Sequence, residues 1–173
     1  SYRIPAPNLE LANKVLAVAA PDLAAPRAVR SVGSPPRIIQ VGRSADSASH
    51  DLVDQSVSLV EEESEALGGG SVAVIAPQSL IDQVDAALKA QGIDYGRATT
   101  ASRNVSGPLH PKIALVPVQL VKGLELDGTV VIGPAVILDE EPQGLLPLFV
   151  ALTRSTKRLA VVHARPLPDV LCD

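Results

Sequence analysis

Methionine and tryptophan are absent from this 173-residue sequence, and Tyr2, Tyr95 and Phe149 are its only aromatic side chains. Cys172 is the sole cysteine, which excludes an internal disulfide bond and any metal site built from cysteines. Apolar residues nevertheless make up 46% of the chain, and most of them are Ala, Val, Leu or Ile. We therefore expect an aliphatic core, which favours layered packing of helices on a sheet.

Long apolar runs and targeting patterns are also missing. No run approaches the roughly 18 to 20 apolar residues that a membrane-spanning helix needs, and no signal-peptide pattern opens the chain. We therefore expect a cytoplasmic protein that has no membrane partner. Because the chain lacks methionine and opens on Ser1 without a leader, we expect residues 1–173 to be one domain cut from a longer protein.

The sequence has no phosphate-binding loop of the usual kind. No Gly-Lys dipeptide occurs, so the G-x-x-x-x-G-K-[ST] pattern is absent, and no G-x-G-x-x-G opens a helix after a strand. The Gly68–Gly70 run precedes an expected strand, so its amides would not lie at a helix N-terminus, and we interpret it as a helix stop. This chain is not expected to hold a triphosphate by itself.

Metal and hydrolase motifs are equally scarce. Asp139, Glu140 and Glu141 end the apolar run VVIGPAVILDEE, which is similar to the strand-plus-acid pattern that holds Mg²⁺ in ATPases. Pro134 interrupts that run, which favours a solvated turn. None of the three histidines is spaced as a metal ligand, and no G-x-S-x-G elbow occurs.

The net charge of −4 is unevenly distributed. Residues 1–43 carry six basic and two acidic side chains, so the excess of acid lies in the remainder. The overall sign argues against a domain that coats nucleic acid. The basic first part is either a solvated face or a local surface that faces phosphate, and the sequence leaves both interpretations open.

Strand-like and helix-like segments alternate along the chain. Five aliphatic runs are expected strands: Arg37–Val41, Ser71–Ala76, Lys112–Val118, Thr129–Gly133 and Leu159–His163. Four segments with helical periodicity are expected near residues 8–19, 47–67, 79–90 and 146–156. This alternation predicts βαβ units, and hence an α/β fold with a mostly parallel sheet covered by helices on both faces.

Details of the helices follow from their end residues and faces. Asn8 is the expected cap of the first helix, which should bury Val18. In the second helix the glutamates at 61, 62, 63 and 65 are expected mostly on the outside. Lys157 and Arg158 suit the negative C-terminal end of the fourth helix.

Two stretches carry more specific signals. In VQLVKGLELDGTVVIGP, Lys122 to Glu125 interrupt a strand; Gly123 allows the backbone to approach a ligand, and Glu125 can accept a sugar hydroxyl. A turn with surface charges is the alternative. In LFVALTRSTKRL, Arg154 follows an apolar helix and is placed either to reach a ligand or to compensate the helix dipole.

Together, in this order and ahead of a final strand, these stretches resemble motifs V and VI of superfamily 1 UvrD/Rep-type helicases. The opening SYRIP is similar to motif IV of that family, so the resemblance covers nearly the whole chain. Gln119 and Leu126 differ from the family's usual histidine and phenylalanine. The resemblance implies the second (C-terminal, 2A) RecA-like domain, a three-layer fold, over residues 1–173.

The resemblance also implies roles by position. Tyr2 would stack on adenine, Arg3 and Arg154 would reach the γ-phosphate across an interdomain cleft, and Glu125 would touch the ribose. Lys122 and Gly123 would belong to the loop that couples the nucleotide to the nucleic acid. ATP and Mg²⁺ would be held mainly by the N-terminal RecA-like domain, which explains the missing phosphate loop.

The interval from Arg3 to Lys122 is too short for the large 2B insertion of UvrD and Rep proteins. This compactness is most similar to the HelD branch, whose members are ATP-driven factors that release RNA polymerase from stalled complexes. The expected partners are the N-terminal domain and RNA polymerase, with nucleic acid as a further one. A DNA-repair helicase that translocates on single strands and a non-catalytic α/β interaction domain remain alternatives.

Overall fold

The central sheet of the computed structural model has six strands in the order β1-β6-β5-β2-β4-β3, and every pair of neighbours runs parallel. The structure describes residues 6–22, 36–40, 48–68, 71–93, 95–97, 113–121, 126–140, 145–153 and 155–163. The strands are β1 (Arg37–Gln40), β2 (Val72–Ala76), β3 (Tyr95–Arg97), β4 (Ile113–Pro117), β5 (Leu126–Ile132) and β6 (Ser155–His163).

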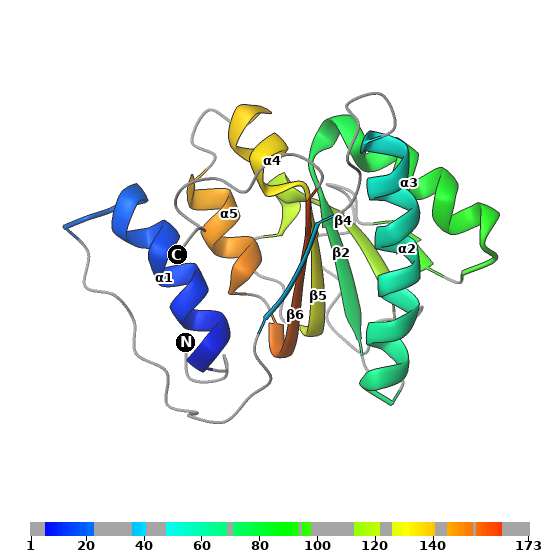
Figure 1. The fold of residues 1–173 in the computed structure, drawn as a ribbon, viewed down its shortest axis with the longest axis horizontal. Coiled ribbons are helices and arrows are strands. Elements are labelled where there is room, and N and C mark those ends of the chain that lie inside the picture. Colours follow the sequence, from blue (N-terminus) through cyan, green and yellow to red (C-terminus); the bar gives the residue numbers. More distant parts are fainter. Residues whose placement is uncertain are drawn as a thin grey trace.

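Helices cover both faces of this sheet. Along the described chain they are α1 (Ala6–Ala19), α2 (Ala48–Ala66), α3 (Gln78–Ala90), the short 3₁₀ helix η2 (Val118–Leu120), α4 (Pro134–Glu140) and α5 (Leu145–Leu152). Helices α2 and α3 lie on one face, and α1, α4 and α5 lie on the other (Figure 1). The expected three-layer α/β fold with a parallel sheet is confirmed.

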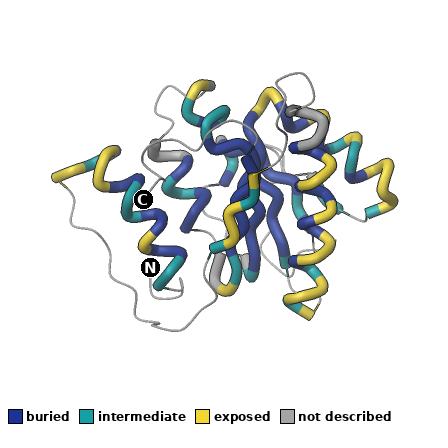
Figure 2. Tube along the Cα trace, in the orientation of Figure 1, coloured by how far each residue is buried: buried dark blue, intermediate teal, exposed yellow. Residues whose placement is uncertain are grey.

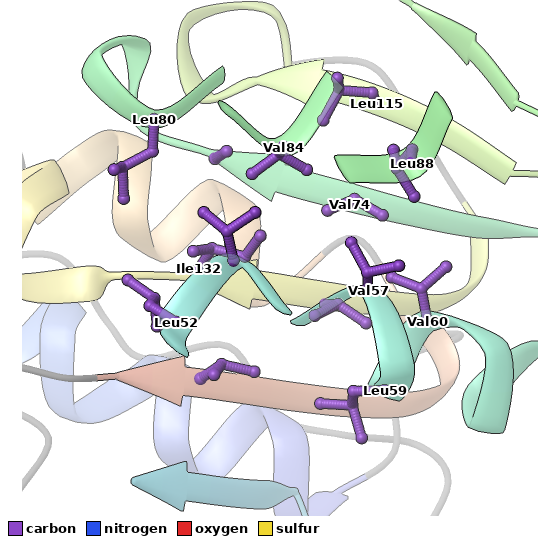
Figure 3. Packing of buried hydrophobic residues seen from close by; sticks show 14 of the residues in the cluster. Leu52, Val57, Leu59, Val60, Val74, Leu80, Val84, Leu88, Leu115 and Ile132 are labelled. Carbon is purple, nitrogen blue, oxygen red and sulfur yellow. The ribbon is translucent and has the colours of Figure 1, made fainter. Parts of the chain in front are cut away.

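The two faces of the sheet bury separate aliphatic clusters. On one face, side chains of α2 and α3 pack on Val74, Leu115 and Ile132 of the strands (Figure 3). On the other face, α1, α4 and α5 pack on alternate residues of the same strands. The central strand β2 is fully buried from end to end, as Figure 2 shows for the middle of the sheet. Burial on both faces explains why its sequence is an unbroken apolar run.

The expected strands exist, but the last two begin earlier than predicted. Strand β5 starts at Leu126 instead of Thr129, and β6 starts at Ser155 instead of Leu159. The polar residues at these positions do not by themselves predict a strand. They belong to β5 and β6 because the backbone pairs with a neighbouring strand. Strand β3 was not predicted, because it has only three residues and lies at the edge of the sheet.

Three helix predictions are wrong in detail. Asn8 does not cap α1 but lies inside it and is fully buried, since the helix begins at Ala6 and accommodates Pro7 in its first turn. Val18, expected inside, is 55% exposed. The fourth helix ends at Leu152, so Lys157 and Arg158 belong to β6 and not to a helix end.

The acidic segment after β5 is also different from the predicted turn. Pro134 begins α4, which includes Asp139 and Glu140, because proline fits the first turn of a helix. The predicted stop at the glycine run is confirmed at Gly68, whose φ of 62° suits a helix C-terminus. Most of the predicted loops over residues 21–36 and 100–111 lies outside the described residues.

Gly128 of β5 marks a close contact between the sheet and the end of α2. A Cβ added there would lie 2.8 Å from Leu67 Cδ1. We expect Gly128→Val to cost about 1 kcal/mol of unfolding free energy, the low end of the range for overpacking, because Leu67 Cδ1 is the end of a flexible side chain. Thermal unfolding of this variant and of the Gly128→Val/Leu67→Ala pair checks the cause, since the second change should recover part of the loss. Equal stability of Gly128→Val and the parent would contradict this contact.

Candidate functional site

The six residues predicted for the site, Tyr2, Arg3, Lys122, Gly123, Glu125 and Arg154, lie outside the described residues. Their flanking segments are described. Helix α1 begins three residues after Arg3, Val121 and Leu126 flank the Lys122–Glu125 stretch, and Thr153 and Ser155 flank Arg154. The structure therefore describes the helices and strands that precede or follow each stretch.

The strands that follow the Lys122–Glu125 stretch and Arg154 are neighbours in the sheet. Leu126, directly after Glu125, is the register partner of Ser155, directly after Arg154. Both residues begin their strands, so the two stretches join the sheet at the same edge. We call the edge formed by the first residues of β2, β5 and β6 the amino edge.

The pairing of β5 and β6 is irregular immediately after this point. Leu126 pairs with Ser155 but Gly128 pairs with Arg158, so two steps on β5 face three steps on β6. The extra residue lies in β6, between Ser155 and Arg158. Bulges of this kind bend a strand locally and redirect the side chains beside it, and they are common next to functional sites.

Asp127 connects the strands of the amino edge. Its carboxylate Oδ2 accepts a hydrogen bond from the Ser71 backbone N–H at 3.2 Å, and its own N–H donates to Ser71 Oγ at 3.2 Å. Asp127 Oδ1 also lies 3.8 Å from Lys157 Nζ. One side chain thus links the residue before β2, the start of β5 and the start of β6.

The last residues of α5 and the turn after it are firmly held. Leu152 is fully buried, and Thr153 is 7% exposed. The Thr153 N–H and hydroxyl both donate to the carbonyl oxygen of Val150, at 3.2 and 3.0 Å. These bonds close the last turn of the helix one residue before Arg154.

The elements next to the three motif-like stretches contribute side chains to one apolar cluster. Leu11 of α1, Val121 after η2, and Leu148 of α5 belong to the same set of buried residues. Helices α1 and α5 pack directly on each other. The start of α1 also lies on the same side of the molecule as the starts of β5 and β6 (Figure 1).

A buried ion-pair network lies on the opposite face of β6. Glu63 of α2 is only 2% exposed and accepts hydrogen bonds from Arg158 Nε at 2.5 Å and from Arg37 Nη1 at 3.0 Å. The four glutamates of α2 were predicted to lie mostly on the outside; Glu61, Glu62 and Glu65 are exposed as predicted, and Glu63 is the exception. The hydrogen bond to Glu63 raises the pKa of the Arg158 guanidinium above its ordinary value, although burial opposes this.

The chemistry available at the amino edge is limited. Within the described ranges no group of three His, Cys, Asp or Glu side chains is arranged to hold a metal ion. The one acid described directly beside the predicted residues, Asp127, has its charge compensated by Lys157 and a backbone N–H. An anionic ligand at this edge would therefore not face an uncompensated carboxylate from Asp127.

None of the described helices has the length and apolar character of a membrane span.

Sequence reasoning missed Asp127 and Glu63. A helical wheel through Ser56, Val60 and Leu67 places Glu63 on the buried side of α2, so periodicity contained the signal. Asp127 lies within the stretch that resembles motif V, but the sequence did not predict its partners, because Ser71 and Lys157 are distant in sequence.

Comparison with known proteins identifies the fold. No protein-family model matches the chain, and no curated protein matches its sequence. The C-terminal domain of a possible DNA helicase from Lactobacillus plantarum WCFS1 superposes with a TM-score of 0.71 at 20% identity, covering 99% of this chain and 92% of that domain.

Two further structures give lower scores. The arterivirus nonstructural protein 10 helicase with DNA has a TM-score of 0.47 at 17% identity, covering 88% of this chain and 31% of the other. The Pyrococcus furiosus Hef helicase domain has a TM-score of 0.44 at 13% identity, covering 68% and 27%. The fold is shown by the superposition with the TM-score of 0.71: over 99% of its length this chain shares an α/β RecA-like fold with the C-terminal domain of a possible DNA helicase.

Proposed function

We propose that this chain is the C-terminal (2A) RecA-like domain of a larger, cytoplasmic superfamily 1 ATPase of the HelD-like type. It supplies half of an ATP site, and the N-terminal RecA-like domain of the same protein supplies the phosphate loop and most contacts to ATP and Mg²⁺. The observation that carries this proposal is the arrangement of the helices and strands next to the three motif-like stretches. Each stretch adjoins an element that contributes to one apolar cluster, and the Lys122–Glu125 stretch and Arg154 directly precede neighbouring strands at one edge of the sheet.

The proposed roles within that half-site are those that the resemblance to the helicase family implies, and they agree with the chemistry of phosphoryl transfer. Bound ATP with Mg²⁺ supplies the phosphoryl group that is transferred to water. Arg154 and Arg3 would place positive charge beside the γ-phosphate, which favours a transition state with charge spread over its oxygens. Tyr2 would stack on the base and Glu125 would accept a ribose hydroxyl. Lys122 and Gly123 would pass the state of the site to the bound polymer or polymerase.

The choice of a HelD-like protein rests on compactness. The four strands between α1 and η2 all belong to the one sheet. The longest gap between described residues in that interval is residues 98–112, which is too short to hold an inserted domain. HelD-like proteins, which the sequence resembles, release RNA polymerase, and we propose the same partner for this chain.

A DNA-translocating helicase is the second candidate, because the structure with a TM-score of 0.71 comes from a possible DNA helicase. The deciding experiment compares ATP turnover by the intact protein alone, with RNA polymerase, and with single-stranded DNA. We expect stimulation by RNA polymerase and co-purification with it, and no turnover by residues 1–173 alone. Stimulation by DNA only would favour the second candidate, and turnover by the isolated chain would contradict the half-site.

A further inference from the structure

Strand β1 contributes little to the core. It lies at one end of the sheet, where β6 is its neighbour. Three of its four residues are exposed, and the partly buried Ile39 packs against the cluster under α2 and α3. Ile38 points to the opposite face and is 42% exposed. Every residue of β2, by contrast, is buried. The burial of apolar side chains therefore holds β1 only weakly.

The side chain of Arg37 attaches the start of β1 to α2. Its Nη1 donates to Glu63 Oε1 at 3.0 Å, and Glu63 is 2% exposed. Its Nη2 lies 3.4 Å from Oε2 of Glu62, whose side chain is 59% exposed. Arg37, itself 41% exposed, thus lies between a buried carboxylate and a hydrated one. Because ion pairs at the surface contribute little, Glu63 is the partner that holds β1.

Glu63 has a second cation, which belongs to another strand. Arg158 of β6 donates through Nε to Glu63 Oε2 at 2.5 Å and through Nη2 to Oε1 at 3.4 Å. Strand β6 lies between β1 and β5, and its residues 159–163 are buried. A buried carboxylate that loses its sole partner is costly, because its charge is left uncompensated. Since Arg158 stays with Glu63, Arg37 can leave without this cost.

From these contacts we infer that β1 is a separable edge strand, which detaches from β6 while the rest of the sheet stays folded. We call the Arg37–Glu63 bond the β1 latch, and Arg158 compensates Glu63 in both the closed and the open state. Opening breaks the pairing of four residues, the packing of Ile39 and the latch. Such local opening requires less free energy than global unfolding. It needs no nucleotide and is independent of the proposed function.

Hydrogen exchange of the intact protein tests the separate opening, with mass spectrometry of peptides that cover β1 and β2. We expect the protected amides of β1 to exchange at least about 100-fold faster than those of β2. Low concentrations of urea should accelerate β2 strongly and β1 by no more than about twofold, because detachment of four residues exposes little surface. Equal rates for the two strands, or an equal response to urea, would overturn the separate opening.

Two substitutions test the latch, because they act on different states. Arg37→Met removes a bond that is lost both when β1 opens and when the whole fold opens, so exchange of β1 and of β2 should rise by a similar factor of about 10. Arg158→Met removes a bond that the open state retains. Exchange of β2 should therefore rise about 10-fold or more, while exchange of β1 does not rise.

Lys89→Met is the matched control. The Lys89 side chain is 71% exposed and pairs with Asp85 within α3, so neither β1 nor β2 should change by more than about twofold. Unchanged exchange of β1 in Arg37→Met would overturn the latch. Faster exchange of β1 in Arg158→Met would show that Arg158 does not compensate Glu63 in the open state, and would also overturn it. Each of these outcomes leaves the proposed ATP half-site standing.

Discussion

Replacing Arg154 with alanine in the intact protein should reduce ATP turnover by about 10³- to 10⁵-fold, while ATP binding changes only a few-fold. An arginine supplied from a second surface stabilises the charge that develops during phosphoryl transfer, and its removal typically costs this much in kcat. The substrate is held mainly elsewhere in our proposal, so the dissociation constant should change little. Steady-state ATPase assays together with equilibrium binding of a non-hydrolysable ATP analogue measure the two quantities separately.

Two further variants sharpen the Arg154 experiment. Arg154→Lys keeps a positive charge but loses the planar fork of donors, so we expect most of the loss to remain. Lys89→Ala removes a charge from a side chain that is 71% exposed on α3, and its turnover should be normal. Near-normal turnover by Arg154→Ala would show that this arginine has no role in the transition state.

Replacing Glu63 with alanine should lower the free energy of unfolding by about 3 kcal/mol. Removing one partner of a buried ion pair costs roughly 3 to 5 kcal/mol, because the remaining charge is left without compensation. The lower end applies because the side chains of Arg37 and Arg158 are 41% and 28% exposed and regain some hydration. For a domain of this size the melting temperature should fall by roughly 6 to 12 °C, which thermal unfolding of residues 1–173 measures.

The neighbouring glutamate provides a matched control for Glu63. Glu62 also reaches Arg37, at 3.4 Å, but its side chain is 59% exposed. Exposed ion pairs contribute little, so Glu62→Ala should change the unfolding free energy by no more than about 0.5 kcal/mol. Equal losses from the two substitutions would contradict a buried network centred on Glu63.

The layers of the fold were predictable because they depend on periodicity. The buried strand β2 and the amphipathic helix α3 each carry their pattern within a few consecutive residues. The start of β6 was not predictable in this way. Ser155 and Thr156 are polar residues without the aliphatic pattern of a buried strand, and the pairing of Ser155 with Leu126 makes them part of β6.

The candidate site divides along the same line. Its motif-like stretches could be found from local residue types, and the six residues themselves remain predictions. The side-chain contacts near the starts of β5 and β6 could not be predicted, because each one joins residues that are distant in sequence: Asp127 with Ser71, and Glu63 with Arg158. A charged side chain such as Glu63 is assigned to the surface by its chemistry alone. Only the packing of α2 on β6 shows that two arginines compensate its charge.

The position of β6 between β1 and β5 has a consequence for the order in which the chain folds. Strand β1 lies near the start of the described chain, yet β6, its neighbour in the sheet, is the last described strand. During synthesis β1 therefore has no sheet to join until β6 has emerged from the ribosome, and such non-local pairing is slow. A nascent chain that stops before Ser155 would leave β1 unpaired and Glu63 without Arg158. Completion of the sheet thus waits for the strand that directly follows Arg154.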